Sequence, residues 1–125
     1  MCPQPARPEF VEVFGALRDI LVKHASRLVV DADTGSNYSL STNVMAPNNK
    51  PMYFGGVSIR KNYVSYHLMP VYTSPDLLEG ISPALSRRMQ GKSCFNFKRV
   101  DEPLFAELAA LTDRGYRQFE QDGWI

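Results

Sequence analysis

Hydrophobic and polar residues alternate most regularly between Pro51 and Pro70, in the stretch PMYFGGVSIRKNYVSYHLMP. Alternation of this kind places successive side chains on opposite faces of a β-strand. It is interrupted at Lys61 and Asn62, and asparagine tolerates the left-handed backbone that a two-residue hairpin turn requires. The pattern therefore predicts two antiparallel strands joined by a tight turn, and we expect this hairpin to form the centre of the fold.

A turn at residues 61–62 determines which residues face each other across the hairpin. On the apolar face, the expected pairs are Ile59 with Val64, Val57 with Tyr66 and Gly55 with Leu68. On the opposite face, they are Arg60 with Tyr63, Ser58 with Ser65, Gly56 with His67 and Phe54 with Met69. A slip of one residue would set apolar groups against polar ones. The small Gly56 should leave room for the imidazole of His67.

Helical spacing of apolar residues appears at both ends of the chain. The first helix is predicted from Pro8 to about residues 24–26, and its apolar positions are Phe10, Val13, Phe14, Leu17, Ile20 and Leu21. The last helix should begin at Asp101 as its cap and end at Gly123, although Gly115 weakens its middle. Its apolar stripe consists of Leu104, Leu108, Leu111 and Phe119.

Shorter elements are predicted between these features. Residues 29–30 and 38–40 are typical of strands around a turn at 33–37, and residues 43–50 of a polar loop. Ser74-Pro75 and Ser82-Pro83 each resemble a helix cap followed by proline, which predicts one turn at 76–79 and a short helix at 84–90. Residues 93–98 should form a further strand that turns Phe95 and Phe97 to the apolar face.

Runs of strands with a helix at each end indicate an α+β fold. We expect an antiparallel sheet around the central hairpin, with the N- and C-terminal helices packed on one face. The length of 125 residues fits a single domain over residues 1–125. Residues 1–7 are expected to be a loose lead-in.

Net charge, apolar runs and cysteine content argue against several classes of protein. The formal net charge of +1 argues against a nucleic-acid binder, which needs a strongly basic surface. No apolar run approaches the ~20 residues of a membrane helix, and the N-terminus lacks the apolar core of a secretory signal. With only Cys2 and Cys94, two free thiols in a cytoplasmic protein are favoured over a disulfide between them.

The sheet face away from the helices is the expected functional surface, because it gathers aromatic, hydroxyl, imidazole, thiol and cationic groups. The candidate ligand-binding residues are Ser58, Tyr63, Ser65, His67, Met69, Cys94, Asn96 and Lys98. A solvated sheet face or a homodimer contact is the alternative interpretation. If the loops at 43–50 and 71–80 cover the face, ligand binding is favoured, whereas a flat, open face favours self-association.

The same face offers two catalytic alternatives. His67 beside Ser58 or Ser65 could act as a base next to a nucleophile, but both serines lie in regular strand and no nucleophile elbow is present. A reactive Cys94 thiol is a second catalytic alternative, favoured by the cations that follow it. No motif requires a cofactor.

Metal binding has weaker support from the sequence. No CxxC, HxxxH or HExxH spacing occurs. The carboxylates that share a side of a predicted element are Glu9 with Glu12 on the first helix and Asp31 with Asp33 at a strand end. These four residues are the candidate ligands if the protein carries a metal.

The segments YFGGVSIRKNYVSYHLMPVY and GKSCFNFK, followed by an amphipathic helix, resemble the YdhG-like family of small bacterial proteins. The resemblance covers roughly residues 8–121. It implies an α+β domain with a curved antiparallel sheet and flanking helices. Some members of that family are labelled frataxin-like iron chaperones, but the resemblance implies no catalytic residue, and this chain has no dense acidic run.

We therefore expect a small cytoplasmic binding domain without catalytic activity, which recognises a small molecule or a protein partner on the outer sheet face. Intracellular metal delivery of the frataxin-like type is the first alternative, and an enzyme that uses His67 or Cys94 is the second.

Overall fold

Strands β3 (Pro51–Ile59) and β4 (Val64–Leu68) form the central hairpin in the computed structural model, which describes residues 8–125. The observed pairs run from Gly55–Leu68 to Ile59–Val64, and they confirm the predicted register of the two strands. The predicted turn conformation is wrong. Asn49 is the one non-glycine residue of the described chain with a positive φ, so Asn62 is not left-handed.

The sheet has six antiparallel strands in the order β1-β2-β3-β4-β6-β5. The four strands outside the hairpin are β1 (Val29–Asp33), β2 (Asn37–Met45), β5 (Met89–Gln90) and β6 (Cys94–Phe97). β1 and β2 are longer than predicted. The predicted helix at 84–90 is too long, because the Arg88 carbonyl accepts a hydrogen bond from the Asn96 amide at 2.8 Å and draws residues 89–90 into the sheet.

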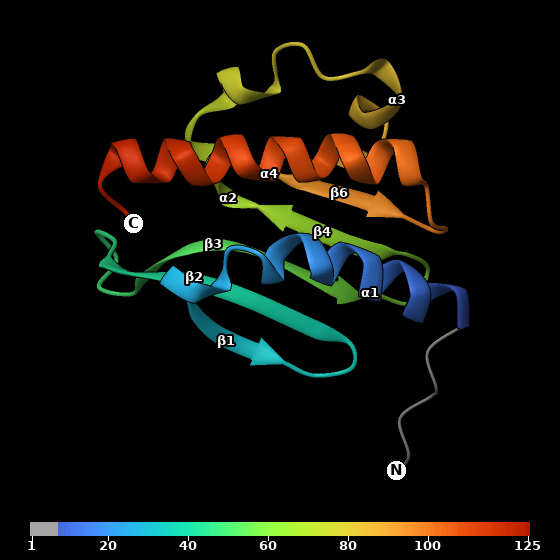
Figure 1. Ribbon diagram of the computed structural model, residues 1–125, viewed down its shortest axis with the longest axis horizontal. Helices are drawn as coiled ribbons and strands as arrows, with labels where there is room; N and C mark the ends of the chain where they lie inside the picture. The colour runs from blue at the N-terminus through green and yellow to red at the C-terminus, as the bar shows by residue number, and fades with distance from the viewer. Residues whose placement is uncertain (1–7) are drawn as a thin grey trace.

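Helices α1 (Pro8–Val22) and α4 (Glu102–Asp122) lie across the same face of the sheet (Figure 1). The predicted ends of α4 are confirmed: Asp101 accepts a hydrogen bond from the Leu104 amide at 3.2 Å, and Gly123 is left-handed with φ 87°. A short 3₁₀ helix, η1 (Ala25–Arg27), follows α1. The α+β architecture with its helices on one face is thus confirmed.

The chain between β4 and β5 forms three short helices beside α4 (Figure 1). They are α2 (Met69–Thr73), the 3₁₀ helix η2 (Pro75–Leu78) and α3 (Pro83–Ser86). A Cβ at Gly115 of α4 would lie 2.9 Å from the Cβ of Pro70. The glycine that weakens α4 therefore allows α2 to approach it closely.

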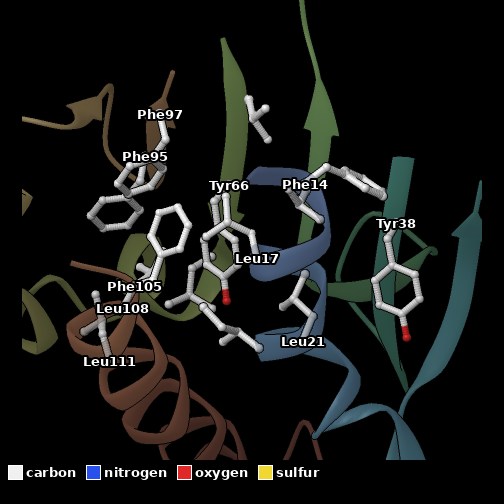
Figure 2. Packing of buried hydrophobic residues seen from close by; sticks show 14 of the residues in the cluster. Phe14, Leu17, Leu21, Tyr38, Tyr66, Phe95, Phe97, Phe105, Leu108 and Leu111 are labelled. Carbon is white, nitrogen blue, oxygen red and sulfur yellow. The ribbon is translucent and has the colours of Figure 1, made fainter. Parts of the chain in front are cut away.

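The core lies between the helix layer and the sheet, as Figure 2 shows. Phe14, Leu17 and Leu21 of α1 meet Tyr66 of β4 in this layer, and the aromatic residues of β6 pack against α4. The hydroxyl of Tyr66 is buried and lies 2.6 Å from Oγ1 of Thr112. Thr112 itself donates to the Leu108 carbonyl, so the Tyr66 hydroxyl donates to Thr112 and no buried hydroxyl is left without a partner here.

Phe54 is on the opposite face from the one predicted. Strand β2 pairs Leu40 with Gly55 but the next residue, Ser41, with Tyr53, so Phe54 is an extra residue in β3. Such a bulge interrupts the alternation of faces. Phe54 is fully buried against Phe119 of α4, at 5.8 Å between ring centroids. Tyr53 takes the place on the outer face that the alternation assigned to Phe54.

Candidate functional site

The face of the sheet away from α1 and α4 carries no described helix across it (Figure 1). Three residues at its centre come from neighbouring strands: Tyr53 from β3, His67 from β4 and Cys94 from β6. His67 pairs with Cys94 in the sheet, and the rings of Tyr53 and His67 lie 5.1 Å apart between centroids. Cys94 is a free thiol and is half-buried.

Tyr53 occupies the space that Gly56 leaves open. The predicted pairing of Gly56 with His67 is confirmed, but a methyl group at Gly56 would overlap the hydroxyl of Tyr53 and lie 3.0 Å from the Tyr38 carbonyl oxygen. The three atoms nearest to an added Cβ belong to Tyr53, Tyr38 and Ser39, so the glycine makes room for the Tyr53 phenol, whereas the sequence pattern predicted room for the His67 imidazole. Burial raises the pKa of Tyr53, and the nearby Cys94 and Asp31 raise it further, so its hydroxyl is a neutral hydrogen-bonding group.

His67 lies 2.7 Å through its Nε2 from Oγ of Ser93, a buried residue. Burial lowers the pKa of His67 below its ordinary value of 6.5. The imidazole is therefore neutral near pH 7, and it can exchange a hydrogen bond with Ser93 without a charge.

A pocket of about 420 Å³, here called the Tyr53 pocket, opens beside this centre. Apolar groups supply much of its wall, and a carboxylate, a hydroxyl, an amide and an ammonium group supply the rest. The lining residues are Asp31, Ser41, Ala46, Asn48, Lys50, Pro51, Met52, Tyr53 and Met69. The hydroxyl of Ser41 donates to the carboxylate of Asp31 within this wall.

The rim of the Tyr53 pocket is a tight turn between β2 and β3. Backbone hydrogen bonds join Ala46 to Lys50 at 2.7 Å and Asn49 to Ala46 at 3.0 Å. The side chain of Asn48 accepts from the Lys50 amide at 3.0 Å, and Asn49 is left-handed with φ 62°. Part of the predicted polar loop at 43–50 thus has a defined shape, and three of its residues line the Tyr53 pocket.

The structure divides the predicted site residues among four places. Met69 lines the Tyr53 pocket, and His67 and Cys94 lie at the centre of the face. Ser58 and Ser65 face each other in the hairpin, and Ser65 also pairs with Asn96. Tyr63, Asn96 and Lys98 line a different pocket at the β5 edge.

The structure also changes the candidate catalytic geometry. His67 is hydrogen-bonded to Ser93 rather than to Ser58 or Ser65. Within residues 8–125, no carboxylate forms an ion pair with His67, and the Ser93 hydroxyl is buried. A base-activated nucleophile needs an accessible oxygen and a group that orients the base, so this pair is better suited to holding His67 in place.

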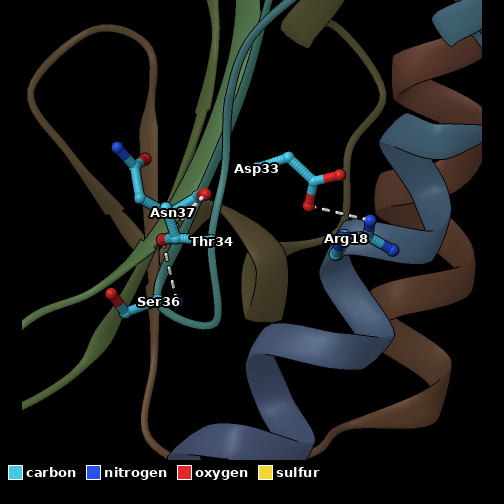
Figure 3. Close-up of polar contacts among 5 residues, drawn as sticks. All are labelled: Arg18, Asp33, Thr34, Ser36 and Asn37. Carbon is cyan, nitrogen blue, oxygen red and sulfur yellow. Dashed lines mark hydrogen bonds and ion pairs between the residues drawn. The ribbon is translucent and has the colours of Figure 1, made fainter.

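The predicted metal ligands lie apart. Arg18 of α1 forms an ion pair with Asp33 at 3.0 Å, beside a turn ordered by the Thr34 hydroxyl (Figure 3). Asp31 binds Ser41, while Glu9 and Glu12 are exposed on α1. Within the described chain, no three histidine, cysteine, aspartate or glutamate side chains gather where they could share a metal ion.

Two residues at the centre of the outer face, Tyr53 and Ser93, are not predicted by the sequence pattern. Tyr53 was missed because the bulge at Phe54 cannot be deduced from the alternation within β3. Ser93 had a usable signal: it directly precedes Cys94, and the register of β4 and β6 brings that position near His67. Its own carbonyl accepts a hydrogen bond from the Leu68 amide at 2.9 Å.

Exposed apolar side chains gather on the other edge of the sheet. They are Val29 and Val30 of β1 and Val44 and Met45 of β2. β1 is an edge strand in the described sheet, and exposed apolar groups at an edge favour association. The homodimer was expected on the outer sheet face and stays a prediction; the β1 edge is a second surface that carries exposed apolar side chains.

Stability should fall below pH 6.5 because of His67. Its pKa is lowered in the folded protein, so the unfolded chain binds a proton more readily and stability decreases as the pH falls from about 6.5 towards the folded pKa. We expect the free energy of unfolding of the His67→Gln variant to decrease less between pH 7.5 and pH 5 than that of the wild type. Urea unfolding at both pH values would measure the two changes. Parallel losses in the two proteins would contradict this assignment. The pKa of Glu107 is lowered from 4.5 mainly by its hydrogen bonds from Ser82. The stability that Glu107 contributes is therefore lost only as the pH falls below about 4.5, outside the range of this experiment.

No helix within residues 8–125 has both the length and the apolar character needed to cross a bilayer. Comparisons with protein-family models, with curated proteins and with solved structures gave no match to this chain. The resemblance to the YdhG-like family therefore stays a prediction, and function has to be inferred from the geometry of the site.

Proposed function

We propose that this protein is a non-catalytic binding domain that holds a small molecule in the Tyr53 pocket. The carrying observation is the pocket itself, with a volume of about 420 Å³ beside the half-buried Tyr53 and His67. Small-molecule sites are typically concave, about 300–1,000 Å³ in volume, largely apolar and supplied with a few polar groups that orient the ligand.

The chemistry of the walls defines the kind of ligand. Met69, Met52 and Pro51 offer apolar contact, while Asp31, Asn48 and Lys50 can exchange hydrogen bonds at the rim. Because one carboxylate and one ammonium group line the pocket, its charges balance. A largely apolar molecule with polar substituents at one end fits these walls better than a highly charged one.

The ordered surroundings of the site support ligand binding. The rim turn is held by its own hydrogen bonds, and His67 is held by Ser93. A site whose walls are already ordered loses less conformational entropy when it binds. The same ordering leaves His67 without an accessible hydroxyl partner for nucleophilic chemistry, which favours a binding role over the enzyme alternative.

A thermal-shift screen of metals, nucleotides and common metabolites tests the proposal. A ligand that binds only the folded state should stabilise it by about 2.7 kcal/mol at a hundredfold excess over its dissociation constant. We expect Met69→Ala to reduce the shift, because Met69 lines the pocket, and Tyr72→Ala to leave it unchanged, because the Tyr72 side chain is exposed and lies outside the pocket lining.

The other outcomes of the screen separate the alternatives. A shift with ferrous ion that is lost in Asp31→Asn and Asp33→Asn would replace this proposal with metal delivery. A ligand whose shift is the same in Met69→Ala and Tyr72→Ala would show that the site lies elsewhere. A screen without any shift would remove the small-molecule function and leave recognition of a protein partner.

A further inference from the structure

A second pocket, here called the basic pocket, lies at the β5 edge of the outer face. Its volume is about 230 Å³, and its polar lining consists of Tyr63, Arg87, Arg88, Gln90, Asn96 and Lys98. It shares no lining residue with the Tyr53 pocket. The two pockets are therefore separate features of the surface, and the second needs its own explanation.

The backbone that carries the two arginines is fixed on both sides. After α3, the Arg88 carbonyl accepts from the Asn96 amide at 2.8 Å, and Met89 pairs with Phe95. Before α3, the carboxylate of Glu107 accepts from both the amide and the hydroxyl of Ser82 at 2.6 Å. Because both ends are anchored, the arginines are presented at a constant position beside β6.

The cations of the basic pocket have no carboxylate partner in the described part of the chain. The ion pairs among residues 8–125 are Arg18–Asp33, His24–Asp113 and Arg27–Glu120, and none involves Arg87, Arg88 or Lys98. An adjoining pocket shares Arg88 and Lys98 and adds Arg99 and Asp101. Asp101 accepts the capping hydrogen bond of α4. In a chain of net charge +1, this is a local excess of positive charge.

We infer that the basic pocket binds the phosphoryl group of a small phosphorylated molecule. Two guanidinium groups and one ammonium group supply the charge and the paired N–H donors that phosphate oxygens accept. Asn96 donates to the Oε1 of Gln90 at 2.8 Å, which leaves the amide N–H groups of Gln90 for a ligand. Tyr63 adds a phenol to the lining.

The size of the pocket and the charge of the whole chain select a small ligand over a nucleic acid. A volume of about 230 Å³ suits one phosphorylated group and a short substituent. Nucleic-acid binding depends on several cations that follow a backbone of phosphates, whereas the formal net charge of this chain is +1. The ligand class is therefore a phosphate monoester, with free phosphate as the other source of the same chemistry.

Titration calorimetry on the full chain tests this inference, with glycerol phosphate and inorganic phosphate as probes and glycerol as the uncharged control. The variant Arg88→Gln/Lys98→Gln should bind glycerol phosphate more than about tenfold more weakly than the wild type. The variant Lys23→Gln/Arg117→Gln loses the same charge at exposed positions outside the pocket and should bind like the wild type. Because all four side chains are exposed, both variants should melt near the wild-type temperature without ligand.

The results of this calorimetry can be told apart from those of the thermal-shift screen that tests the Tyr53 pocket. Binding of the ester alone, or of ester and free phosphate together, supports the inference when only the Arg88 and Lys98 variant weakens it. Equal weakening in both variants, or no heat with either probe, overturns it. A short single-stranded oligonucleotide that binds while glycerol phosphate does not would overturn it in favour of nucleic acid. Met69→Ala should leave glycerol phosphate binding unchanged.

Discussion

Replacing Phe54 by alanine is expected to lower the free energy of unfolding by about 3–5 kcal/mol, the range found for large aromatic residues in cores. Phe54 is fully buried and packs against Phe119 and Tyr116 of α4 and against His24. The loss of its ring would leave a cavity at the point where β3 meets the C-terminal part of α4 and the residues that follow α1. Urea unfolding followed by far-UV circular dichroism would measure the change.

The matched control for this prediction is Tyr72→Ala, since Tyr72 is an aromatic residue with 53% of its surface exposed. A surface substitution of this kind should change stability by less than about 0.5 kcal/mol. If Phe54→Ala were equally mild, Phe54 would have to lie on the outer face, as simple alternation predicts. The bulge and the position of Tyr53 would then both be wrong.

A single methyl group at Gly55 is expected to cost about 1–3 kcal/mol, the usual range for overpacking. A Cβ at Gly55 would lie 2.8 Å from the backbone carbonyl oxygen of His67 and 3.4 Å from Cδ2 of Leu21. The carbonyl belongs to the neighbouring strand of the hairpin, so it cannot move aside without disturbing the pairing of β3 with β4. The loss should appear as a lower midpoint of urea unfolding for Gly55→Ala.

Gly35→Ala is the control for the same chemical change. Gly35 has no neighbouring atom within 4 Å of an added Cβ, and its backbone is not among the positive-φ glycines. Alanine there should be neutral or stabilising by up to about 1 kcal/mol, because it restricts the unfolded chain. If the two variants unfolded at the same urea concentration, β3 and β4 could not approach as closely as described.

The elements that the sequence predicts well are those whose signals are local. The register of the hairpin follows from alternation in two adjacent strands and the short turn between them. The last helix follows from Asp101 at its start and Gly123 at its end, and both act through hydrogen bonds or backbone conformation within one turn. Such features depend on neighbouring residues, so a single sequence contains the information.

The features that could not be predicted depend on residues distant in the chain. The bulge at Phe54 exists because Leu40 and Ser41 of β2 pair with Gly55 and Tyr53 of β3, and nothing within β3 shows it. The strand at 89–90 exists because Arg88 binds Asn96 across a turn. In each case a pairing partner overrides the local preference of the segment.

The candidate site could be predicted only in part, because some of its residues are brought together by segments that are distant in the chain. Alternation identified the outer face and placed His67 and Cys94 there together, as observed. The walls of the Tyr53 pocket come from β1, β2 and β3, from the turn between β2 and β3 and from the start of α2. Their meeting depends on the packing of the whole sheet, so the pattern indicated a surface but not its two pockets.

The extra residue in β3 also has a consequence for protein engineering. The outward positions of this strand near the pocket are 53, 56 and 58, so an interval of three is followed by an interval of two. A combinatorial library that randomised every second codon through 54, 56 and 58 would place one variable position in the core and discard most clones as unfolded. Choosing 53 in place of 54, and leaving Gly56 unchanged because a Cβ there would lie 3.0 Å from the Tyr38 carbonyl oxygen, would keep the diversity on the surface that a new ligand could contact.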